Sequence, residues 1–183
     1  MKIAGSYTLA APRDRVWPII FDPAALLDLI PGCDQIESDG PDSYRGTITL
    51  RLPAISGTYR TAIRILDRRE PELCRLDGEA AGSGGFVRGQ AAFTLSDADG
   101  GTLVEYEGDA IIAGPLAGIN PRFVEGVVQA LIRQGLGRLD AQAAAAMAVE
   151  APAAPARRPP LLARLMAWLR GVVRSVFLRQ KLV

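Results

Sequence analysis

The side chains that most often perform enzymatic chemistry are scarce in this chain of 183 residues. It contains no histidine, the usual general base and metal ligand at neutral pH. The two cysteines, Cys33 and Cys74, lie far apart in the sequence and do not form a zinc-binding pattern. Several acidic residues have the spacing of solvated strand faces and turns: Asp97, Asp99, Glu105, Glu107 and Asp109. The sequence therefore predicts a non-enzymatic protein without a metal site.

A glycine-rich stretch is superficially similar to a phosphate-binding loop. It reads GSGGFVRGQ and covers residues 82–90. Phosphate-binding loops end in Gly-Lys-Ser/Thr and connect a strand to a helix, whereas this stretch lacks that ending and lies between two expected strands. We interpret it as a hairpin turn or as the mouth of a cavity.

Alternating apolar and polar residues predict that the chain is built mainly from strands. The first strand is expected at residues 3–9, and six more follow with the short turn signals of an antiparallel meander. These six are expected near residues 34–39, 42–53, 57–68, 72–82, 86–96 and 102–113. Before them, Pro18 and Pro23 are expected to break residues 11–33 into two short helices.

A long helix is expected after the last strand. Asn120 and Pro121 are a favourable start, because asparagine caps a helix and proline fits its first position. Apolar residues then recur at helical spacing: Phe123, Val124, Val127, Val128, Leu131 and Ile132. This order of elements indicates one α+β domain over residues 1–148, in which the long helix covers one face of a curved antiparallel sheet.

Many residues expected on the covered face of the sheet are small. A packed core needs larger side chains, so small residues under a helix favour a cavity, although they also serve close helix approach and sheet curvature. We predict an apolar cavity in which tyrosines supply the few polar groups. Its predicted lining is Tyr7, Tyr44, Gly46, Tyr59, Gly78, Ala80, Gly89, Ala91, Phe93, Tyr106, Gly108, Ala110, Phe123, Val127 and Leu131.

Arginines alternate with these inward positions and are expected on the opposite face of the sheet. They are Arg45, Arg51, Arg60, Arg64 and Arg75. Such a face is usually solvated, and its alternative role is a docking surface for a protein partner.

The end of the chain, residues 159–183, has the pattern of a basic amphipathic helix. Charges recur every few residues, whereas a membrane-spanning helix needs roughly 18 apolar residues in succession. We predict a helix lying in the membrane interface. Docking on its own domain and binding in a partner's groove are the alternatives. The predicted membrane residues are Leu161, Leu162, Arg164, Leu165, Trp168, Leu169, Arg170, Val172, Val173, Arg174, Val176, Phe177 and Lys181.

Charge is divided unevenly along the chain. Residues 157–183 hold seven of the 21 Lys and Arg residues and none of the 20 Asp and Glu residues, so this part carries +7 and the rest −6. Anionic lipid attracts such a basic segment. Residues 149–158 are rich in alanine and proline and are expected to link the domain to the tail.

The remaining features bear on location. The first residues, MKIAGSYTLAAP, lack the apolar core of a signal peptide, and two cysteines do not suggest a disulfide framework. We therefore expect a peripheral protein on the cytoplasmic face of a bacterial inner membrane. We expect no nucleic acid among its partners.

Three stretches, in order, carry a resemblance to a known family. They are GSYTLAAPRDRVWPIIFDP leading to LIPGC, then GSGGFVRGQA, then VEGV in the long helix. Residues 1 to about 148 resemble the carbon monoxide dehydrogenase G-subunit family, which belongs to the START-like (SRPBCC) helix-grip superfamily of ligand-binding domains. The resemblance implies a curved sheet wrapped around the long C-terminal helix. The IPGC and GSGGFVRG motifs, residues 30–33 and 82–89, match the family, but no catalytic residue is carried over.

The resemblance also implies a function. Members recruit a cytoplasmic molybdenum-containing carbon monoxide dehydrogenase, or a related molybdenum hydroxylase, to the membrane. The family also implies a respiratory quinone, ubiquinone or menaquinone, bound non-covalently in the cavity, with no covalent cofactor. The alternative is a helix-grip enzyme of the aromatase/cyclase type acting on a hydrophobic substrate. The absence of histidine and of a buried-acid pattern argues against it.

Overall fold

The structure is a computed structural model that describes residues 1–52 and 55–150. Met1–Ala148 form one compact unit. The predicted membrane helix, residues 159–183, and residues 151–158 of the predicted linker lie outside the described residues. The described part of the chain contains no helix long and apolar enough to cross a membrane.

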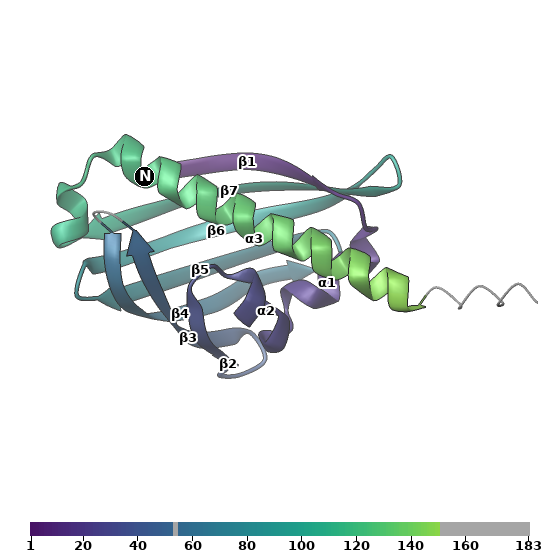
Figure 1. The fold of residues 1–183 in the computed structure, drawn as a ribbon, viewed down its shortest axis with the longest axis horizontal. Coiled ribbons are helices and arrows are strands. Elements are labelled where there is room, and N and C mark those ends of the chain that lie inside the picture. Colours follow the sequence, from purple (N-terminus) through teal and green to yellow (C-terminus); the bar gives the residue numbers. More distant parts are fainter. Residues whose placement is uncertain (53–54, 151–183) are drawn as a thin grey trace, which may run out of the picture. The chain divides into compact units, whose positions relative to one another are not determined.

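Seven antiparallel strands form a single sheet in the order β1-β7-β6-β5-β4-β3-β2 (Figure 1). Strands β2 to β7 follow one another as a meander, and β1 closes the order by pairing with β7. Every predicted strand is present, with ends shifted by three residues or fewer. The strands are β1 Lys2–Leu9, β2 Cys33–Ser38, β3 Ser43–Leu52, β4 Ile55–Arg69, β5 Leu73–Gly82, β6 Gly85–Ala98 and β7 Gly101–Ala113.

Two short helices connect β1 to β2, as predicted, but the break between them differs from the prediction. Helix α1 spans Arg13–Ile20 and contains Pro18, which therefore does not end it. The interruption comes at Asp22 and Pro23, where α2 (Pro23–Leu29) begins. Asp22 caps α2 by accepting a hydrogen bond from the Ala24 amide, and Pro23 fits the first helical position, where no amide donor is required.

The long helix α3 spans Pro121–Glu150 and crosses one face of the sheet (Figure 1). The Asn120 side chain accepts a hydrogen bond from the Arg122 amide, which confirms the predicted start. A short 3-10 helix, η1 (Pro115–Gly118), precedes α3 and has no counterpart in the prediction. The helix also continues through Val149 and Glu150, which the sequence assigned to the linker.

Two polar contacts hold α3 against the start of the chain. The Ala10 amide donates to Asp140 Oδ1 at 2.8 Å, and Arg138 Nη1 donates to the Asp28 carbonyl oxygen at 2.6 Å. The second half of α3 is therefore tied to the α1–α2 region.

A large apolar cluster, here called the filled core, lies under α1, α2 and the second half of α3. Within this cluster, the ring centroid of Trp17 lies 5.0 Å from that of Phe21 and 6.2 Å from that of Phe93. Its buried members are Leu9, Ala11, Val16, Trp17, Leu29, Tyr44, Ile65, Cys74, Leu95, Val104, Leu139 and Ala143.

A second, smaller cluster lies at the opposite end of the sheet. It consists of Ile55, Tyr59, Leu116 and Val124, and is here called the tip cluster. These residues come from β4, η1 and the first turn of α3. The inner face of the sheet is thus packed at both ends.

Candidate ligand-binding cavity

The cross-strand register places the small inward residues in two adjacent rows. Gly78, Gly89 and Ala110 are direct neighbours on β5, β6 and β7. Two residues further along the strands, Leu76, Ala91, Gly108 and Ile3 form the next row. Residues two apart on a strand share a face, so both rows face α3. The sequence-based assignment of these positions to one face is correct.

A cavity of about 470 Å³ lies between these rows and α3. Ligand sites typically have volumes of about 300–1,000 Å³ and mostly apolar walls. Ala91 is solvent-exposed although it faces the helix, because no side chain fills the space above it. Gln90, Ala92, Glu107 and Asp109 also border the cavity, but they alternate with the inward residues of β6 and β7. The other wall residues are mainly apolar: Met1, Ile3, Ile20, Leu76, Gly78, Val87, Gly89, Ala91, Phe93, Val104, Tyr106, Gly108, Ala110, Val128, Ile132, Leu136 and Leu139.

Seven residues of the predicted lining are in this wall. They are Gly78, Gly89, Ala91, Phe93, Tyr106, Gly108 and Ala110. The cavity adjoins both apolar clusters, because Phe93 packs against the filled core and Val87 packs against the tip cluster.

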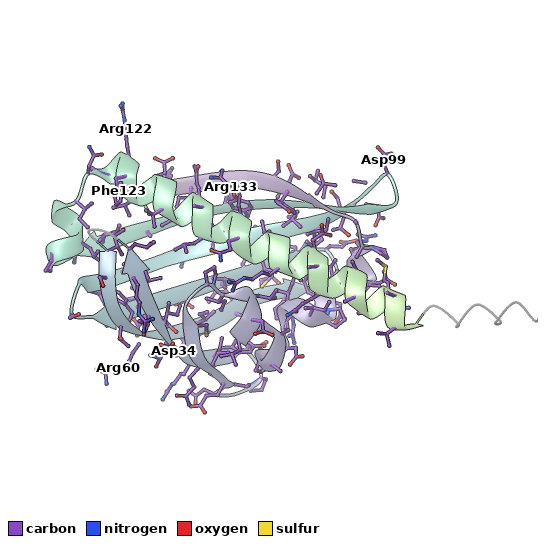
Figure 2. The ribbon with its side chains drawn as sticks, in the orientation of Figure 1. Asp34, Arg60, Asp99, Arg122, Phe123 and Arg133 are labelled. Atoms are coloured by element: carbon purple, nitrogen blue, oxygen red, sulfur yellow. The ribbon has the colours of Figure 1, made fainter. Side chains whose placement is uncertain are left out.

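The face that α3 presents to the cavity differs from the predicted one. Phe123 is 44% exposed at the first turn, and Figure 2 shows it at that end of the helix. Val127 packs against the tip cluster, and Leu131 is outside the cavity wall. The wall is formed by Val128, Ile132, Leu136 and Leu139. The apolar stripe predicted for α3 is wide enough to cover two faces of the helix. Phe123, Val127 and Leu131 belong to the face that does not line the cavity.

Three of the four predicted tyrosines do not line the cavity. Tyr44 belongs to the filled core, where its hydroxyl donates to the Phe21 carbonyl oxygen at 3.0 Å. Tyr59 belongs to the tip cluster. Tyr7 lies beside α3, where a Cβ on Gly137 would be 3.7 Å from its hydroxyl oxygen. Tyr106 is the tyrosine in the wall, and its hydroxyl is not engaged in a hydrogen bond with any described residue.

Gly46 and Ala80 also lie away from the cavity wall. A Cβ at Gly46 would approach the carbonyl oxygen of Gln35, so glycine allows β2 to lie close to β3. Ala80 packs against the tip cluster. Their small size therefore serves packing, which is one of the alternatives that the sequence left open.

The glycines of the cavity floor differ in how much space surrounds them. A Cβ at Gly89 would clash with the Asp109 carbonyl oxygen, so glycine is required by strand packing. A Cβ at Gly78 would have its nearest neighbour, the Ala62 carbonyl oxygen, at 3.6 Å, an ordinary contact distance. Strand packing therefore does not require glycine at position 78, and its small size favours a role in keeping the cavity open.

A glycine on the neighbouring strand leaves space for the Tyr106 ring. Gly5 is directly opposite Tyr106, and a Cβ at Gly5 would be 2.5 Å from the phenol oxygen. The phenol ring thus occupies the space that any side chain at residue 5 would need. Glycine at position 5 therefore makes room for the phenol in the cavity wall.

The cysteines are outside the cavity wall. Burial raises the pKa of the Cys74 thiol to about 11, and burial also raises the pKa of the Cys33 thiol. Both thiols are therefore protonated at neutral pH and are poor nucleophiles. The chemistry that the cavity itself can offer is burial of an apolar molecule and one hydrogen bond from Tyr106.

Sequence reasoning missed the apolar wall residues contributed by other elements. Ile20 comes from α1 and Val104 from the start of β7, while Leu136 and Leu139 lie beyond the predicted helical stripe. Continuing the helical spacing from Ile132 through Leu136 and Leu139 would have identified the last two.

An antiparallel sheet wrapped around a long C-terminal helix, with an apolar cavity between them, defines a START-like helix-grip domain. This α+β fold is the predicted one, and a START superfamily protein from Mycobacterium smegmatis shares it at a TM-score of 0.60 with 14% identity, covering 78% of this chain and 96% of that chain. The chain belongs to the carbon monoxide dehydrogenase G-subunit (CoxG) family, whose model matches residues 5–144. The resemblance found in the sequence motifs is therefore confirmed.

Solved structures from other bacteria are also similar. A conserved protein from Geobacillus kaustophilus is 28% identical with a TM-score of 0.76, covering 79% of this chain and 95% of that chain. A protein from Chromobacterium violaceum is 20% identical with a TM-score of 0.58, covering 78% of this chain and 96% of that chain. A comparison with curated proteins gives no match.

Proposed function

We propose that the protein is a non-enzymatic, membrane-tethered carrier that holds a respiratory quinone, ubiquinone or menaquinone, in the cavity under α3. It serves a molybdenum-containing carbon monoxide dehydrogenase or a related molybdenum hydroxylase, as membership of the CoxG family suggests. The observation that carries the proposal is the apolar cavity of about 470 Å³ with the phenol of Tyr106 in its wall.

The residues of the wall fit a quinone. The Tyr106 hydroxyl can donate a hydrogen bond to a quinone carbonyl oxygen, and the rows of glycine and alanine leave room for a flat ring. The aliphatic side chains of α3, Val128, Ile132 and Leu136, provide an apolar surface for an isoprenoid chain. When bound, the quinone supplies the capacity to accept electrons, and the protein's own residues bind it and exclude water.

The membrane part of the proposal rests on the basic amphipathic pattern of residues 159–183. A full chain and a chain ending at Ala156 are compared by co-sedimentation with phosphatidylglycerol vesicles. We expect the full chain to sediment and the shorter chain to remain in solution. Added salt should weaken the binding only in part, because screening acts on charges and leaves apolar burial intact. Equal sedimentation of both chains would show that residues 159–183 are not the membrane anchor.

Filling the cavity tests the carrier proposal directly. Gly78→Leu adds a side chain where the backbone has room for a Cβ, so we expect a folded protein with most of its ligand displaced. Glu79→Leu adds the same side chain at the next residue, on the opposite face of β5, and should keep its ligand. Organic extracts of the purified full-length proteins are measured by mass spectrometry. A folded Gly78→Leu variant with a full complement of quinone would contradict the carrier proposal.

A further inference from the structure

The two ends of the sheet differ in what they expose. At the tip end, β3 passes to β4, β5 turns into β6, and β7 leads through η1 to α3 (Figure 1). These segments lie together, because the Leu116 amide donates to the Gly84 carbonyl oxygen at 2.9 Å and Val124 packs with Ile55 in the tip cluster. At the turn end lie the β2–β3, β4–β5 and β6–β7 turns and the β1–α1 connection.

Three large apolar side chains are exposed at the tip end. Phe86 is 37% exposed on β6, Ile111 is 73% exposed on β7, and Phe123 is 44% exposed on α3. Phe86 and Ile111 are diagonal neighbours on the outer face of the sheet, because Phe86 is opposite Ala113 and Ile111 is opposite Arg88. Single exposed apolar residues are ordinary. Leu27 on α2, Leu66 on β4 and Val149 near the end of α3 are exposed as well, so the tip end is distinguished by the charges that accompany its apolar side chains and not by their number.

Arginines without ion pairs accompany these apolar residues. Arg51, Arg60, Arg88 and Arg122 form no salt bridge with any described residue. Figure 2 shows Arg122 extending away from the sheet beside Phe123. Three acidic residues, Asp34, Glu79 and Glu125, lie in the same region, one fewer than the four arginines. The tip end is therefore apolar and positively charged.

The turn end differs in that most of its arginines are paired with acids: Arg13 with Glu72 and Asp97, Arg45 with Asp39, Arg68 with Asp42, and Arg69 with Asp67. Arg64 and Arg75, which also lie toward this end, form no salt bridge with a described residue. Further acids, such as Glu70 and Asp99, are also at this end, and Figure 2 shows Asp99 there. An anionic surface would therefore attract the tip end more strongly than the turn end.

The tip end also lies next to the cavity. Met1, Val87 and Val128 line the cavity and pack against the tip cluster as well. Tyr59 in this cluster is only 4% exposed, and its hydroxyl has no hydrogen-bond partner among the described residues. A buried hydroxyl without a partner regains a hydrogen bond when water or a lipid headgroup reaches it. Moving the residues of the tip cluster apart would therefore break no hydrogen bond of the Tyr59 hydroxyl.

We propose that the tip end is a second lipid-contact surface, which docks on an anionic bilayer and turns the nearer end of the cavity toward the lipid. Phe86, Ile111 and Phe123 enter the interface, and the arginines bind lipid phosphates. This inference rests on the proposed carrier function and adds the route by which the apolar ligand passes between bilayer and cavity. In this arrangement the ligand does not cross water.

The position of the surface favours lipid over a protein partner. Arginine and aromatic residues are common at protein–protein interfaces too, but this surface adjoins a cavity whose proposed ligand is held in the bilayer. Alternation of cationic and apolar side chains is typical of surfaces that lie in the headgroup region.

Quenching by lipid bromines tests the contact without reference to any ligand. The chain has two tryptophans: Trp17 is buried in the filled core, and Trp168 is removed by Trp168→Phe. On this full-length background, Phe123→Trp places a fluorophore at the tip end. Leu66→Trp is the matched control, because Leu66 is 52% exposed on β4 toward the turn end. Both variants are mixed with phosphatidylglycerol vesicles with and without brominated acyl chains.

We expect brominated vesicles to quench the Phe123→Trp variant and to leave the Leu66→Trp variant unchanged. Arg122→Glu, added to the Phe123→Trp variant, should reduce the quenching, whereas Arg133→Glu, farther along α3, should not. No quenching of either tryptophan, or equal quenching of both, would overturn the proposal. Loss of partner-enzyme binding in Arg122→Glu with unchanged quenching would overturn it in favour of a protein-docking surface.

Quinone uptake is measured in a separate experiment, so that a failure of the lipid-contact surface can be told apart from a failure of the carrier function. Phe123→Ser should slow quinone uptake from vesicles and leave the capacity for quinone supplied in detergent unchanged. A protein that shows quenching at residue 123 but binds no quinone in detergent would keep the lipid-contact surface and contradict the carrier function. Unchanged uptake from vesicles by Phe123→Ser would contradict the proposed route.

Discussion

One sheet supports a filled region and a hollow region on the same face. At the border of the filled region, Cys74, Phe93 and Tyr106 are neighbours across β5, β6 and β7, and Phe93 and Tyr106 also form part of the cavity wall. Four residues along the same strands, the neighbours are Gly78, Gly89 and Ala110. The strand pairing is continuous through both regions, so the difference is in side-chain volume alone. The backbone fixes the fold, and side-chain size decides where a ligand can bind.

The difference has an energetic meaning. Burying a large apolar side chain stabilises a fold by about 1.5–3 kcal/mol. The hollow region forgoes this contribution, and the filled core must supply the stability of the domain. Substitutions that destabilise folding should therefore concentrate around Trp17, and those that affect binding should concentrate around Gly78.

The largest expected effect comes from Trp17→Ala. Trp17 is 3% exposed and contacts Phe21 and Phe93, so its removal leaves a cavity in the filled core. We expect the free energy of unfolding to fall by about 3–5 kcal/mol, measured by urea denaturation. Phe123→Ala at the exposed end of α3 serves as the control and should change it by well under about 1 kcal/mol. Similar losses for both would show that burial in the filled core is not the source of the effect.

The two floor glycines should respond differently to alanine. Gly89→Ala pushes a Cβ against the Asp109 carbonyl oxygen, and we expect a loss of about 1–3 kcal/mol. Gly78→Ala meets no close atom and should be neutral or slightly stabilising, because alanine restricts the unfolded chain. Thermal unfolding of both variants measures the difference. A large loss in Gly78→Ala would show that this glycine serves packing after all.

A buried hydrogen bond at the edge of the filled core gives a smaller effect. Thr102 is fully buried, and its hydroxyl donates to the Ala11 carbonyl oxygen at 2.7 Å. Thr102→Val keeps the shape and leaves that carbonyl without this donor, so we expect a loss of about 1–2 kcal/mol in urea denaturation. Thr94→Val, on a less buried part of β6 next to the same end, should have almost no effect. A neutral Thr102→Val would show that the carbonyl finds another donor.

The smallest effect is a dependence on pH. Burial raises the pKa of Cys74 to about 11 from an ordinary value of 9.0. The folded thiol holds its proton when the unfolded thiol has lost it, so the contribution of Cys74 to stability is constant below pH 9 and falls as the pH rises toward 11. At pH 10 the loss is about 1 kcal/mol. Cys74→Ala should lack this part of the pH dependence, and an identical pH profile in both proteins would contradict the shift.

The fold could be predicted from sequence because its signals are local. Period-two patterning and turn residues placed all seven strands, and Asn120 with Pro121 placed the start of α3. Pro18 was misjudged, because a proline within a short helix that packs on the filled core through Val16 and Trp17 is tolerated there. Tertiary packing outweighed the local rule.

The site could be predicted only in part, because two of its determinants are not local. Strand parity identified the glycines and alanines of the floor, since a side chain's face follows from its position along the strand. The rotation of α3 about its axis depends on where the helix meets α2, and at Gly135 a Cβ would lie 3.1 Å from the Leu29 carbonyl oxygen. In that orientation Val128 and Ile132 line the cavity, and Phe123 and Leu131 do not. No pattern within the helix encodes it.

The contact between Gly5 and Tyr106 has a consequence for how this chain can vary. The phenol oxygen occupies the position where a side chain at residue 5 would begin. A descendant chain with a larger residue at position 5 must also replace or turn aside the residue at position 106. The two positions, on separate strands and far apart in the sequence, are therefore expected to be inherited as a pair.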